Sequence, residues 1–356
     1  MMSEQTTKLI ELINEGKTCN EICHILNISN KQLFNNLTIL QNKGFHYNRK
    51  YYSNGAIVYR PIKSNSGLGE FYSKKDISII TSHNEIEINT LEISDLHCGN
   101  ELERLDLLDR VYNYCIKNNI HIIFLCGDII DGTYAKGNQN IKDTYYQIEH
   151  VIKNFPFDKN ILVISTAGDH DFSGLYMNNQ DIITMLKNYR HDIIVGNYGN
   201  TFVHLKNDTI HLFHKLNGSI FIQSDVAIAF HGHLHKYSVK QKEDGTLHIT
   251  VPSLSNINQP MPTAIQSTLK FNKGYINEVY LNQIYFGDDD YILNEIKFNI
   301  SKRNNIPSSS ILNEEKEREE IFDDYTKEST VDDSKTLVKK TQRLSQIEKF
   351  NKRYGL

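Results

Sequence analysis

The sequence predicts an α/β fold that is preceded by a small helical unit and followed by a charged tail. From about residue 85, β-rich runs such as "IHIIFLCG" alternate with helical stretches, and each run ends in a loop with charged or histidine residues. The earlier residues instead show a helical pattern and then two β-prone runs. We therefore expect four segments: a helical unit over 1–65, a linker over 66–84, the α/β domain over 85–300, and a charged linker with a C-terminal helix over 301–356.

The composition indicates a soluble protein that is large enough to bury a core. Of its 356 residues, 39% are hydrophobic and 23% are charged, and the formal net charge of -4 gives no overall attraction to nucleic acid. No run of about 18 apolar residues occurs, and the opening "MMSEQTTK" has no apolar signal core, so we expect neither a membrane partner nor export. The five cysteines lack metal-knuckle spacing, which favours reduced thiols and a cytoplasmic location.

Glycine and capping residues divide the first segment into three short helices. The first helix ends before Gly16, a residue that suits the left-handed position after a helix. Thr18 with Glu21, and then Ser29 with Gln32, form capping boxes that open the second and third helices. The segment therefore predicts a helix-turn-helix.

Two β-prone runs follow these helices and flank Asn54-Gly55, a strong signal for a hairpin turn. Helices and hairpin together resemble a winged helix-turn-helix, a family of DNA-binding domains whose third helix enters the major groove while the hairpin touches the backbone. Residues 1–63 hold eight Lys or Arg against four Glu, so this unit is basic within an acidic chain. The resemblance implies DNA as a partner, with contacts from the third helix through Lys31, Gln32, Asn35 and Asn36. The alternative is a unit that docks another protein.

The stretch "VAIAFHGHLHKY" ends an apolar strand with three histidines spaced by two. Residues two apart in a strand share a face, so His231, His233 and His235 either crowd one another or converge on a ligand. Other strand ends carry matching groups, namely Asp95, His97, Asp128, Asp169 and His214. Carboxylates and neutral imidazoles are ligands for divalent cations, and one carboxylate can bridge two of them.

In this order, the motifs resemble those of the calcineurin-like metallophosphoesterases: D-x-H, G-D, G-N-H-[DE], H and G-H-x-H. The resemblance covers residues 85–300 and implies a four-layer α/β/β/α sandwich with a two-metal centre between the sheets. It implies one ion on Asp95, His97 and His235, a second on Asp169, His214 and His233, and Asp128 as the bridge. His231 falls outside the pattern and is expected to be structural.

The resemblance also implies the chemistry and its cofactors. Two divalent cations, Mn²⁺ in the first place with Fe or Zn as alternatives, activate a water for in-line attack on phosphorus. His170 is expected to act as the general acid on the leaving oxygen, and Asp171 to orient His170.

The third motif departs from the family pattern, because Asp169 stands where the family has asparagine. Two divalent ions bring four positive charges, and the imidazoles are neutral. The carboxylates of Asp95, Asp128 and Asp169 therefore leave a net charge of one positive unit at the centre. With asparagine in place of Asp169, as in the family, the net charge would be two positive units. The extra carboxylate should tighten metal binding and weaken phosphate binding. We expect Asp169 to remain a ligand and the enzyme to be active.

The substrate class follows from what surrounds these motifs. Protein phosphatases of the superfamily have arginine after the second aspartate of G-D-x-x-D-R-G, whereas this chain has Gly132. The double-strand-break repair nucleases use the same metal motifs without that arginine, so the sequence favours a DNA phosphodiesterase or nuclease. Two alternatives stay open: a DNA-binding regulator with a detuned centre, and a phosphodiesterase or phosphatase of small molecules.

The tail divides into two oppositely charged blocks after the linker "SKRNNIPSSS". Residues 314–333 hold ten acids against three bases, and residues 334–356 hold seven bases against one acid. The second block predicts a basic amphipathic helix that binds a protein partner or nucleic acid. Alternatively, the two blocks pair with each other in solution.

Overall fold

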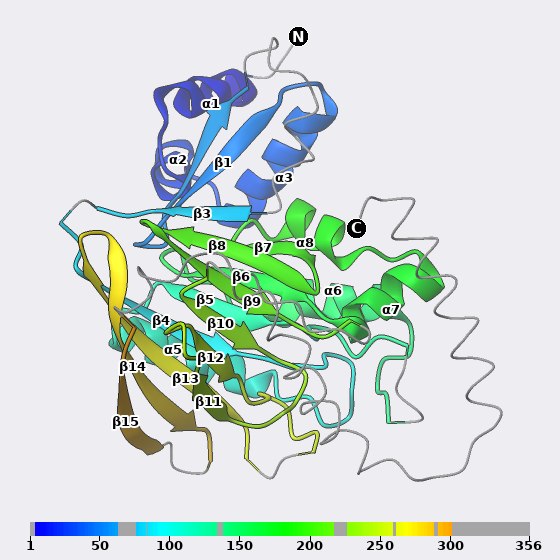
Figure 1. Cartoon of the computed structure of the whole chain (residues 1–356). Coiled ribbons are helices and arrows are strands. Elements are labelled where there is room, and N and C mark those ends of the chain that lie inside the picture. Colours follow the sequence, from blue (N-terminus) through cyan, green and yellow to red (C-terminus); the bar gives the residue numbers. More distant parts are fainter. Residues whose placement is uncertain are drawn as a thin grey trace, which may run out of the picture. The chain divides into compact units, whose positions relative to one another are not determined.

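Two β-sheets that face each other form the centre of an α/β fold (Figure 1). The structure is a computed structural model, and it describes residues 4–62, 76–82, 84–133, 138–216, 226–258, 261–287 and 291–300. Both sheets are mixed, since parallel and antiparallel strand pairs occur in each. The predicted α/β class is therefore confirmed.

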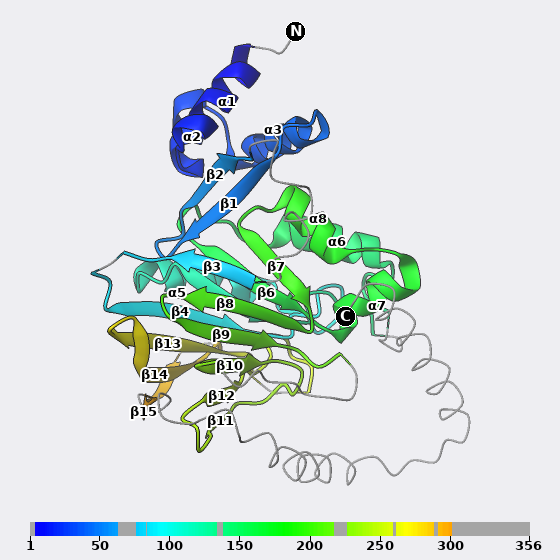
Figure 2. The same ribbon diagram turned by 45° about the horizontal axis from the view of Figure 1, so that its top comes forward.

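One sheet has eight strands, and the two strands at one of its edges come from the N-terminal unit (Figure 2). The strands are β1 (Tyr47–Tyr52), β2 (Ile57–Pro61), β3 (Asp76–Ile80), β8 (Asn200–Leu205), β9 (Asp208–Phe213), β10 (Ile228–His231), β11 (Ser238–Gln241) and β12 (Leu247–Thr250). Their order is β11-β12-β10-β9-β8-β3-β1-β2. Because β9, β10 and β12 run parallel, their carboxyl ends lie at the same edge.

The other sheet has seven strands, of which the two central parallel ones, β5 and β6, are mostly apolar. Its strands are β4 (Glu87–Ile93), β5 (Ile122–Cys126), β6 (Leu162–Ala167), β7 (Ile193–Tyr198), β13 (Thr263–Asn272), β14 (Tyr275–Tyr285) and β15 (Tyr291–Asn299), in the order β15-β14-β13-β4-β5-β6-β7. β5 and β6 are buried along their whole length. Strands covered on both faces have this continuous hydrophobic pattern.

Four helices cover the outer face of the seven-stranded sheet. They are α5 (Asp106–Lys117), α6 (Thr144–Asn154), α7 (Asp169–Asn178) and α8 (Ile182–Tyr189). α5 buries Leu107, Val111 and Cys115, a spacing of four that forms one apolar stripe. This stripe packs with Leu91 and Ile93 of β4 in a single hydrophobic core.

A second core fills the space between the two sheets. Phe124 of β5 and Phe230 of β10 face each other across it, with ring centroids 5.8 Å apart. The residues of β9 and β10 that alternate with this core, including His211 and His231, lie on the opposite face of the eight-stranded sheet. Among the described residues no helix packs on that face, so they supply three of the four predicted layers and the fourth stays a prediction.

The N-terminal unit contains the three helices and the hairpin that its capping residues predict. The helices are α1 (Glu4–Glu15), α2 (Cys19–Leu26) and α3 (Asn30–Asn42). Both capping boxes form, at Thr18 with Glu21 and at Ser29 with Gln32, and Gly16 adopts a φ of +75° after α1. The assignment of this unit as a DNA-binding winged helix stays a prediction.

The hairpin of β1 and β2 continues the eight-stranded sheet instead of projecting from it. β1 pairs in parallel with β3, and the amide of Ser53 at the turn donates to the carbonyl of Ile80 at 2.9 Å. Gly55 in the turn has a φ of +79°, and a side chain there would collide with the backbone of Asn160. The turn therefore packs against the α/β part, in contrast to the hairpin that lies along DNA in the resemblance.

β3 lies inside the segment that the sequence predicts to be a linker. Residues 76–80 of that segment form this strand, while 63–75 are outside the described residues. The described residues from 4 to 300 fall within one compact unit, and the predicted domain bounds within it stay a prediction.

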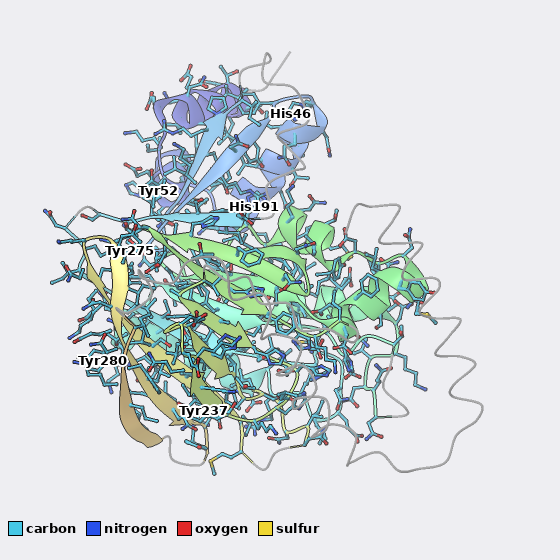
Figure 3. The ribbon with its side chains drawn as sticks, viewed as in Figure 1. His46, Tyr52, His191, Tyr237, Tyr275 and Tyr280 are labelled. Atoms are coloured by element: carbon cyan, nitrogen blue, oxygen red, sulfur yellow. The ribbon has the colours of Figure 1, made fainter. Side chains whose placement is uncertain are left out.

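His191 fastens the N-terminal unit to the α/β part. His191 is labelled at this junction in Figure 3. Its Nδ1 lies 2.8 Å from the hydroxyl of Tyr59, and its ring stacks on Phe34 with centroids 4.4 Å apart. Thr38 of α3 donates to the carbonyl of Asn188 at the end of α8, at 3.2 Å. The N-terminal unit is thus held by sheet pairing, ring packing and a helix-end hydrogen bond.

Three further predictions concern the C-terminal tail, membrane-spanning helices and the cysteines. The charged tail over 301–356, with its expected protein partner, is outside the described residues. Among the described residues, we find no helix with the length and apolar character to span a membrane. All five cysteines are free thiols.

Glu92 on β4 is a carboxyl group buried in the core between the sheets. It accepts hydrogen bonds from the hydroxyls of Thr90 at 2.5 Å and Ser267 at 2.6 Å. Burial raises the pKa of Glu92 from 4.5 to about 8, although both hydroxyls act to lower it. Between these pH values the folded chain holds a proton that the unfolded chain has released.

Glu92→Gln should flatten the pH dependence of folding stability. The stability linked to Glu92 is fully present below pH 4.5 and is lost as the pH rises through about 8, whereas an amide does not titrate. We expect Tm to fall less between mildly acidic and mildly alkaline buffer in the variant than in the wild type. Glu87→Gln, at the exposed start of the same strand, should behave like the wild type, and equal behaviour of both variants would contradict the assignment.

Candidate metal centre

The carboxyl ends of five strands bring imidazole and carboxylate side chains into one region. The seven residues predicted as metal ligands closely follow β4, β5, β6, β9 and β10, and they are Asp95, His97, Asp128, Asp169, His214, His233 and His235. β4, β5 and β6 are parallel to one another, and so are β9 and β10, so these loops leave each sheet at one edge. The structure places all seven in two neighbouring groups.

Five of these seven residues have left-handed backbone conformations. The φ angles are 52° at Asp95, 48° at His97, 50° at Asp128, 74° at His233 and 53° at His235. For a residue with a side chain this conformation costs about 1–2 kcal/mol. It persists only where the surrounding structure enforces it, and such strain concentrates at functional sites.

The first group contains Asp95, His97 and His235. His235 Nε2 lies 3.2 Å from Asp95 Oδ1 and 3.3 Å from His97 Nε2, and His97 Nε2 lies 4.0 Å from the same Asp95 oxygen. Ligand atoms around a tetrahedral cation, at about 2.1 Å from it, are about 3.4 Å apart. The group therefore has the dimensions of a cation site.

The second group contains Asp128, Asp169, His214 and His233. His214 Nε2 lies 3.1 Å from Asp128 Oδ2 and 3.3 Å from Asp169 Oδ1. His233 Nδ1 also lies 3.3 Å from that Asp169 oxygen. The Oδ2 atom of Asp128 is in addition 3.8 Å from His97 Nε2 in the first group. Asp128 thus lies between the groups, as a bridging carboxylate requires.

Two atoms in the second group are buried and have no hydrogen-bond partner. They are Asp169 Oδ1 and His214 Nε2, which face each other. A buried polar atom without a partner costs free energy, and a cation between these atoms would satisfy both. The donor set and these two atoms together fit a pair of divalent cations.

Backbone carbonyls fix the orientation of the inward-facing imidazoles. His214 Nδ1 lies 2.6 Å from the carbonyl of Cys126, and His235 Nδ1 lies 2.9 Å from that of Ile257. A carbonyl only accepts, so each Nδ1 donates to it and each Nε2 points into the centre, where it can bind a cation once its own proton is released. This outer contact is the usual support of a metal-bound histidine.

The carboxylates and imidazoles stabilise each other's charges. Burial acts to raise the pKa of Asp95, but the hydrogen bond to His235 and the charges of His214 and His97 bring it below its ordinary value. Burial lowers the pKa of His235, but Asp95 outweighs this effect and raises it to about 9. Without a metal ion, protons on the imidazoles supply the positive charge that balances the carboxylates. Binding of a cation would release these protons.

Two glycines let the strands approach this closely. A side chain at Gly232, just after β10, would collide with the carbonyl of Cys126 and the hydroxyl of Ser94. A side chain at Gly168, after β6, would collide with the Asp128 carboxylate. Both positions therefore need glycine for the two groups to stand side by side.

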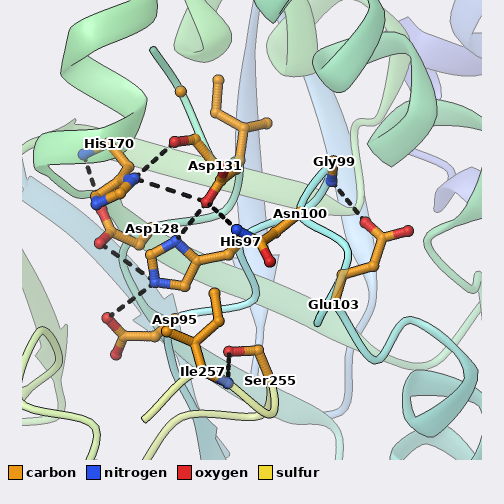
Figure 4. Close-up of polar contacts among 12 residues, drawn as sticks. Asp95, His97, Gly99, Asn100, Glu103, Asp128, Asp131, His170, Ser255 and Ile257 are labelled. Atoms are coloured by element: carbon orange, nitrogen blue, oxygen red, sulfur yellow. Dashed lines mark hydrogen bonds and ion pairs between the residues drawn. The ribbon is translucent and has the colours of Figure 1, made fainter. Parts of the chain in front are cut away.

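His170 lies beside the first group, with its ring centroid 4.6 Å from that of His97 (Figure 4). His170 Nδ1 lies 2.6 Å from the backbone carbonyl of Asp131. The Asp171 carboxylate instead accepts hydrogen bonds from the amides of Gly168 at 2.7 Å, Ile130 at 2.9 Å and Ile129 at 3.2 Å. The Asp171 side chain thus ties two strand-end loops together, and its predicted role toward His170 stays a prediction.

Asp131 is a site residue to which the sequence analysis assigned no role. Its carboxylate lies 3.3 Å from His97 Nδ1 and accepts from the amides of Asn100 at 3.1 Å and Gln139 at 2.7 Å (Figure 4). Its position three residues after Asp128 in the same loop is the sequence feature that could have indicated its place in the site. Asp131 holds both His97, through its carboxylate, and His170, through its carbonyl.

The remaining predicted residues lie away from these groups. Lys31, Gln32 and Asn35 are exposed on α3, and Asn36 is half-buried. The Gln32 side chain is engaged with Ser29 in the capping box at 2.8 Å, which ties it to the helix end. His231 belongs to neither group and packs on Phe213 with ring centroids 4.7 Å apart.

Asp128→Ala should reduce the bound divalent metal from two ions per chain to one at most. Removing this carboxylate takes a ligand from the second group and the bridge from between the groups. Elemental analysis by mass spectrometry after metal loading and desalting would measure the ratio. His231→Gln serves as the matched control and should keep both ions. Two ions in Asp128→Ala would contradict the bridging position.

Comparisons with known proteins give likenesses among solved structures. No protein-family model and no curated protein matches the chain. The phosphoesterase Yfce from E. coli is 18% identical, with 60% of this chain and 100% of that chain covered and a TM-score of 0.36. A dimetal phosphatase from Danio rerio is 10% identical (60% and 99% covered, TM-score 0.38), and the nuclease MPE from Pseudomonas putida is 14% identical (57% and 87% covered, TM-score 0.32). At such identities and TM-scores, function has to be argued from the site itself.

Proposed function

We propose that this chain is a metal-dependent phosphodiesterase that acts on DNA. The observation that carries this proposal is the pair of His/Asp groups that share Asp128. Two cations held there, Mn²⁺ in our proposal with Fe or Zn as the other candidates, would supply Lewis acidity and an activated water for attack on phosphorus. This chemistry suits phosphate esters because cations stabilise the negative charge that builds on oxygen atoms in the transition state of their hydrolysis.

The protein residues around the groups match the remaining needs of ester hydrolysis. As water attacks phosphorus, the P–O ester bond breaks and the leaving oxygen needs a proton. His170 can supply it from Nε2, because its Nδ1 is committed to the carbonyl of Asp131. The His170 side chain is 23% exposed, so it reaches a substrate at the surface of the centre.

The N-terminal unit supports DNA as the substrate. α3 exposes Lys31 and Asn35, whose side chains can contact phosphates and base edges. Because β1 pairs with β3 and His191 packs on Phe34, the unit is held against the α/β part. DNA bound on α3 would therefore have a defined position relative to the metal centre.

Metal-dependent hydrolysis of DNA is the direct test of this proposal. We expect Mn²⁺-dependent cleavage of single-stranded, double-stranded or nicked DNA, lost by at least about a thousandfold in Asp128→Ala because both groups lose a ligand. His231→Gln should cleave like the wild type. Faster turnover of bis-p-nitrophenyl phosphate than of the monoester is expected of a diesterase. If the metal-loaded wild type cleaves no DNA but hydrolyses p-nitrophenyl phosphate, the proposal is contradicted.

Asp169→Asn should separate metal binding from substrate binding. The change removes one negative charge beside the second group, so metal affinity should fall by about tenfold and KM for an anionic diester should fall as well. Metal titration and steady-state kinetics at saturating Mn²⁺ measure the two effects. Unchanged metal affinity together with unchanged KM would show that Asp169 lies outside the coordination of the second ion.

A further inference from the structure

α3 contacts the rest of the protein along two of its sides and leaves a third side exposed. One side is buried in the core of the N-terminal unit, with Leu33, Leu37 and Leu40. A second side meets α8 and His191, where Phe34 stacks on the imidazole and Thr38 donates to a carbonyl of α8 (Figure 1). At about 100° per residue around the helix axis, the remaining side is centred between Asn35 and Ile39.

The exposed side of α3 combines an apolar side chain with amides and lysines. Ile39 is 50% exposed, although it is a large hydrophobic residue. Asn35 is exposed one turn before it, and Lys31, Asn42 and Lys43 are exposed toward the two ends of the same side. We call these five residues the outer face of α3.

Helix stability does not explain this choice of side chains. Asparagine and the β-branched isoleucine are weaker helix formers than alanine, lysine or glutamate. Because Ile39 is half exposed, it also adds little to the core of the unit. A single exposed isoleucine is ordinary on a protein surface, but here it lies on one helix face with an amide and a lysine. These three kinds of group are the ones that contact base edges and phosphates in a DNA groove.

The charge of this region favours a polyanion as the partner. Residues 22–69 contain six Lys or Arg and no Asp or Glu, in a chain that has 43 acidic residues. α3 itself contains no carboxylate. Lys31 and Lys43 lie near its two ends, and within the described residues neither is engaged in an ion pair. Phosphates along both ends of the helix would therefore meet a cation and no acidic side chain of α3.

The spacing along the outer face matches the spacing of base pairs in a duplex. Side chains four residues apart on a helix are about 6 Å apart along its axis, while bases stack about 3.4 Å apart. Asn35 and Ile39 would therefore face base pairs one or two steps apart. In the major groove, an asparagine amide pairs with the N6 and N7 atoms of adenine, and an apolar side chain packs on the methyl group of thymine.

We propose that the outer face of α3 reads A·T base pairs in the major groove of duplex DNA. Asn35 binds the edge of an adenine, Ile39 contacts the methyl group of a thymine, and Lys31 contacts a phosphate. A G·C pair offers neither the methyl group nor the adjacent donor and acceptor that an amide matches on adenine. This inference rests on the proposed function and deepens it, because it names the base composition of the DNA that the chain holds.

Removal of the thymine methyl group tests the contact of Ile39 without changing the hydrogen bonds of the base pair. The full chain in EDTA is titrated, by fluorescence anisotropy, with labelled duplexes of equal length: alternating A·T, the same duplex with deoxyuridine for thymidine, and alternating G·C. Wild type should bind the A·T duplex about fourfold more tightly than the deoxyuridine duplex, as expected for one buried methyl group. Ile39→Ala should bind these two duplexes equally, and the conservative Ile39→Val should retain most of the difference.

Two further variants separate the adenine contact from the phosphate contact. Wild type should prefer the A·T duplex to the G·C duplex by about twentyfold, and Asn35→Ala should lower this preference to about the fourfold that the methyl contact supplies. Lys31→Gln should weaken binding of all three duplexes alike. It should also reduce the slope of log Kd against log salt by about 0.9, the value for one phosphate contact on duplex DNA.

Matched controls separate a loss of contact from a loss of structure. Ile25→Ala removes an isoleucine that is 47% exposed on α2, and Asn113→Ala removes an exposed asparagine within α5. Lys117→Gln removes an exposed lysine at the end of α5. All three should bind the duplexes like the wild type. Alanine is a better helix former than isoleucine or asparagine, so Ile39→Ala and Asn35→Ala should keep or raise the wild-type Tm.

Three results would overturn the inference. The first is equal binding of the A·T and deoxyuridine duplexes by the wild type, or binding of no duplex at all. The second is an undiminished difference between these duplexes in Ile39→Ala. The third is an unchanged preference for A·T over G·C in Asn35→Ala.

The assay is read without hydrolysis, so the two proposals fail separately. A wild-type chain that distinguishes thymine from uracil through Ile39 but cleaves no phosphodiester would contradict the proposed function and support this inference. Cleavage of DNA by a chain that binds the three duplexes alike would do the reverse.

Discussion

The candidate centre depends on bringing three carboxylates together inside the protein. Asp95, Asp128 and Asp169 would repel one another strongly at low dielectric. The arrangement relieves this by alternation, because each of these carboxylates has an imidazole nitrogen at 3.1–3.3 Å. The mutual stabilisation appears as lowered pKa values at Asp95 and Asp169 and raised values at His214 and His235. A pair of divalent cations would take over this role, with more charge and without protons.

The two sheets supply the rigidity that such an arrangement needs. Left-handed conformations at five ligand positions are unfavourable locally, and they are maintained by strand ends whose backbone is fixed in a ladder. Carbonyls at the edge of the sheets, such as that of Cys126, set the imidazole that faces inward. Asp171 adds a tie between loops through three backbone amides. Asp131 couples the first group to His170, so the ligand and the proton donor share one support.

The N-terminal unit is also held in place by a continuous sheet. β1 and β2 extend the eight-stranded sheet that also carries β9 and β10, so the unit and two of the five ligand-bearing strands belong to one hydrogen-bonded layer. Packing of Phe34 and Tyr59 on His191 fills the junction with aromatic rings. The hairpin is therefore used for attachment to the α/β part.

The sequence by itself determined the α/β class, the three N-terminal helices, the hairpin turn and the seven candidate ligands. Each of these depends on local chemistry: capping boxes at Thr18 and Ser29, alternation along strands, and acids or histidines placed just after apolar runs. Only the tertiary structure decided the roles of Asp131, Asp171 and His191, and the pairing of β1 with β3. These depend on which loops meet across strand ends and which segment completes a sheet edge. Such contacts are set by packing between distant segments, so local patterns do not contain them.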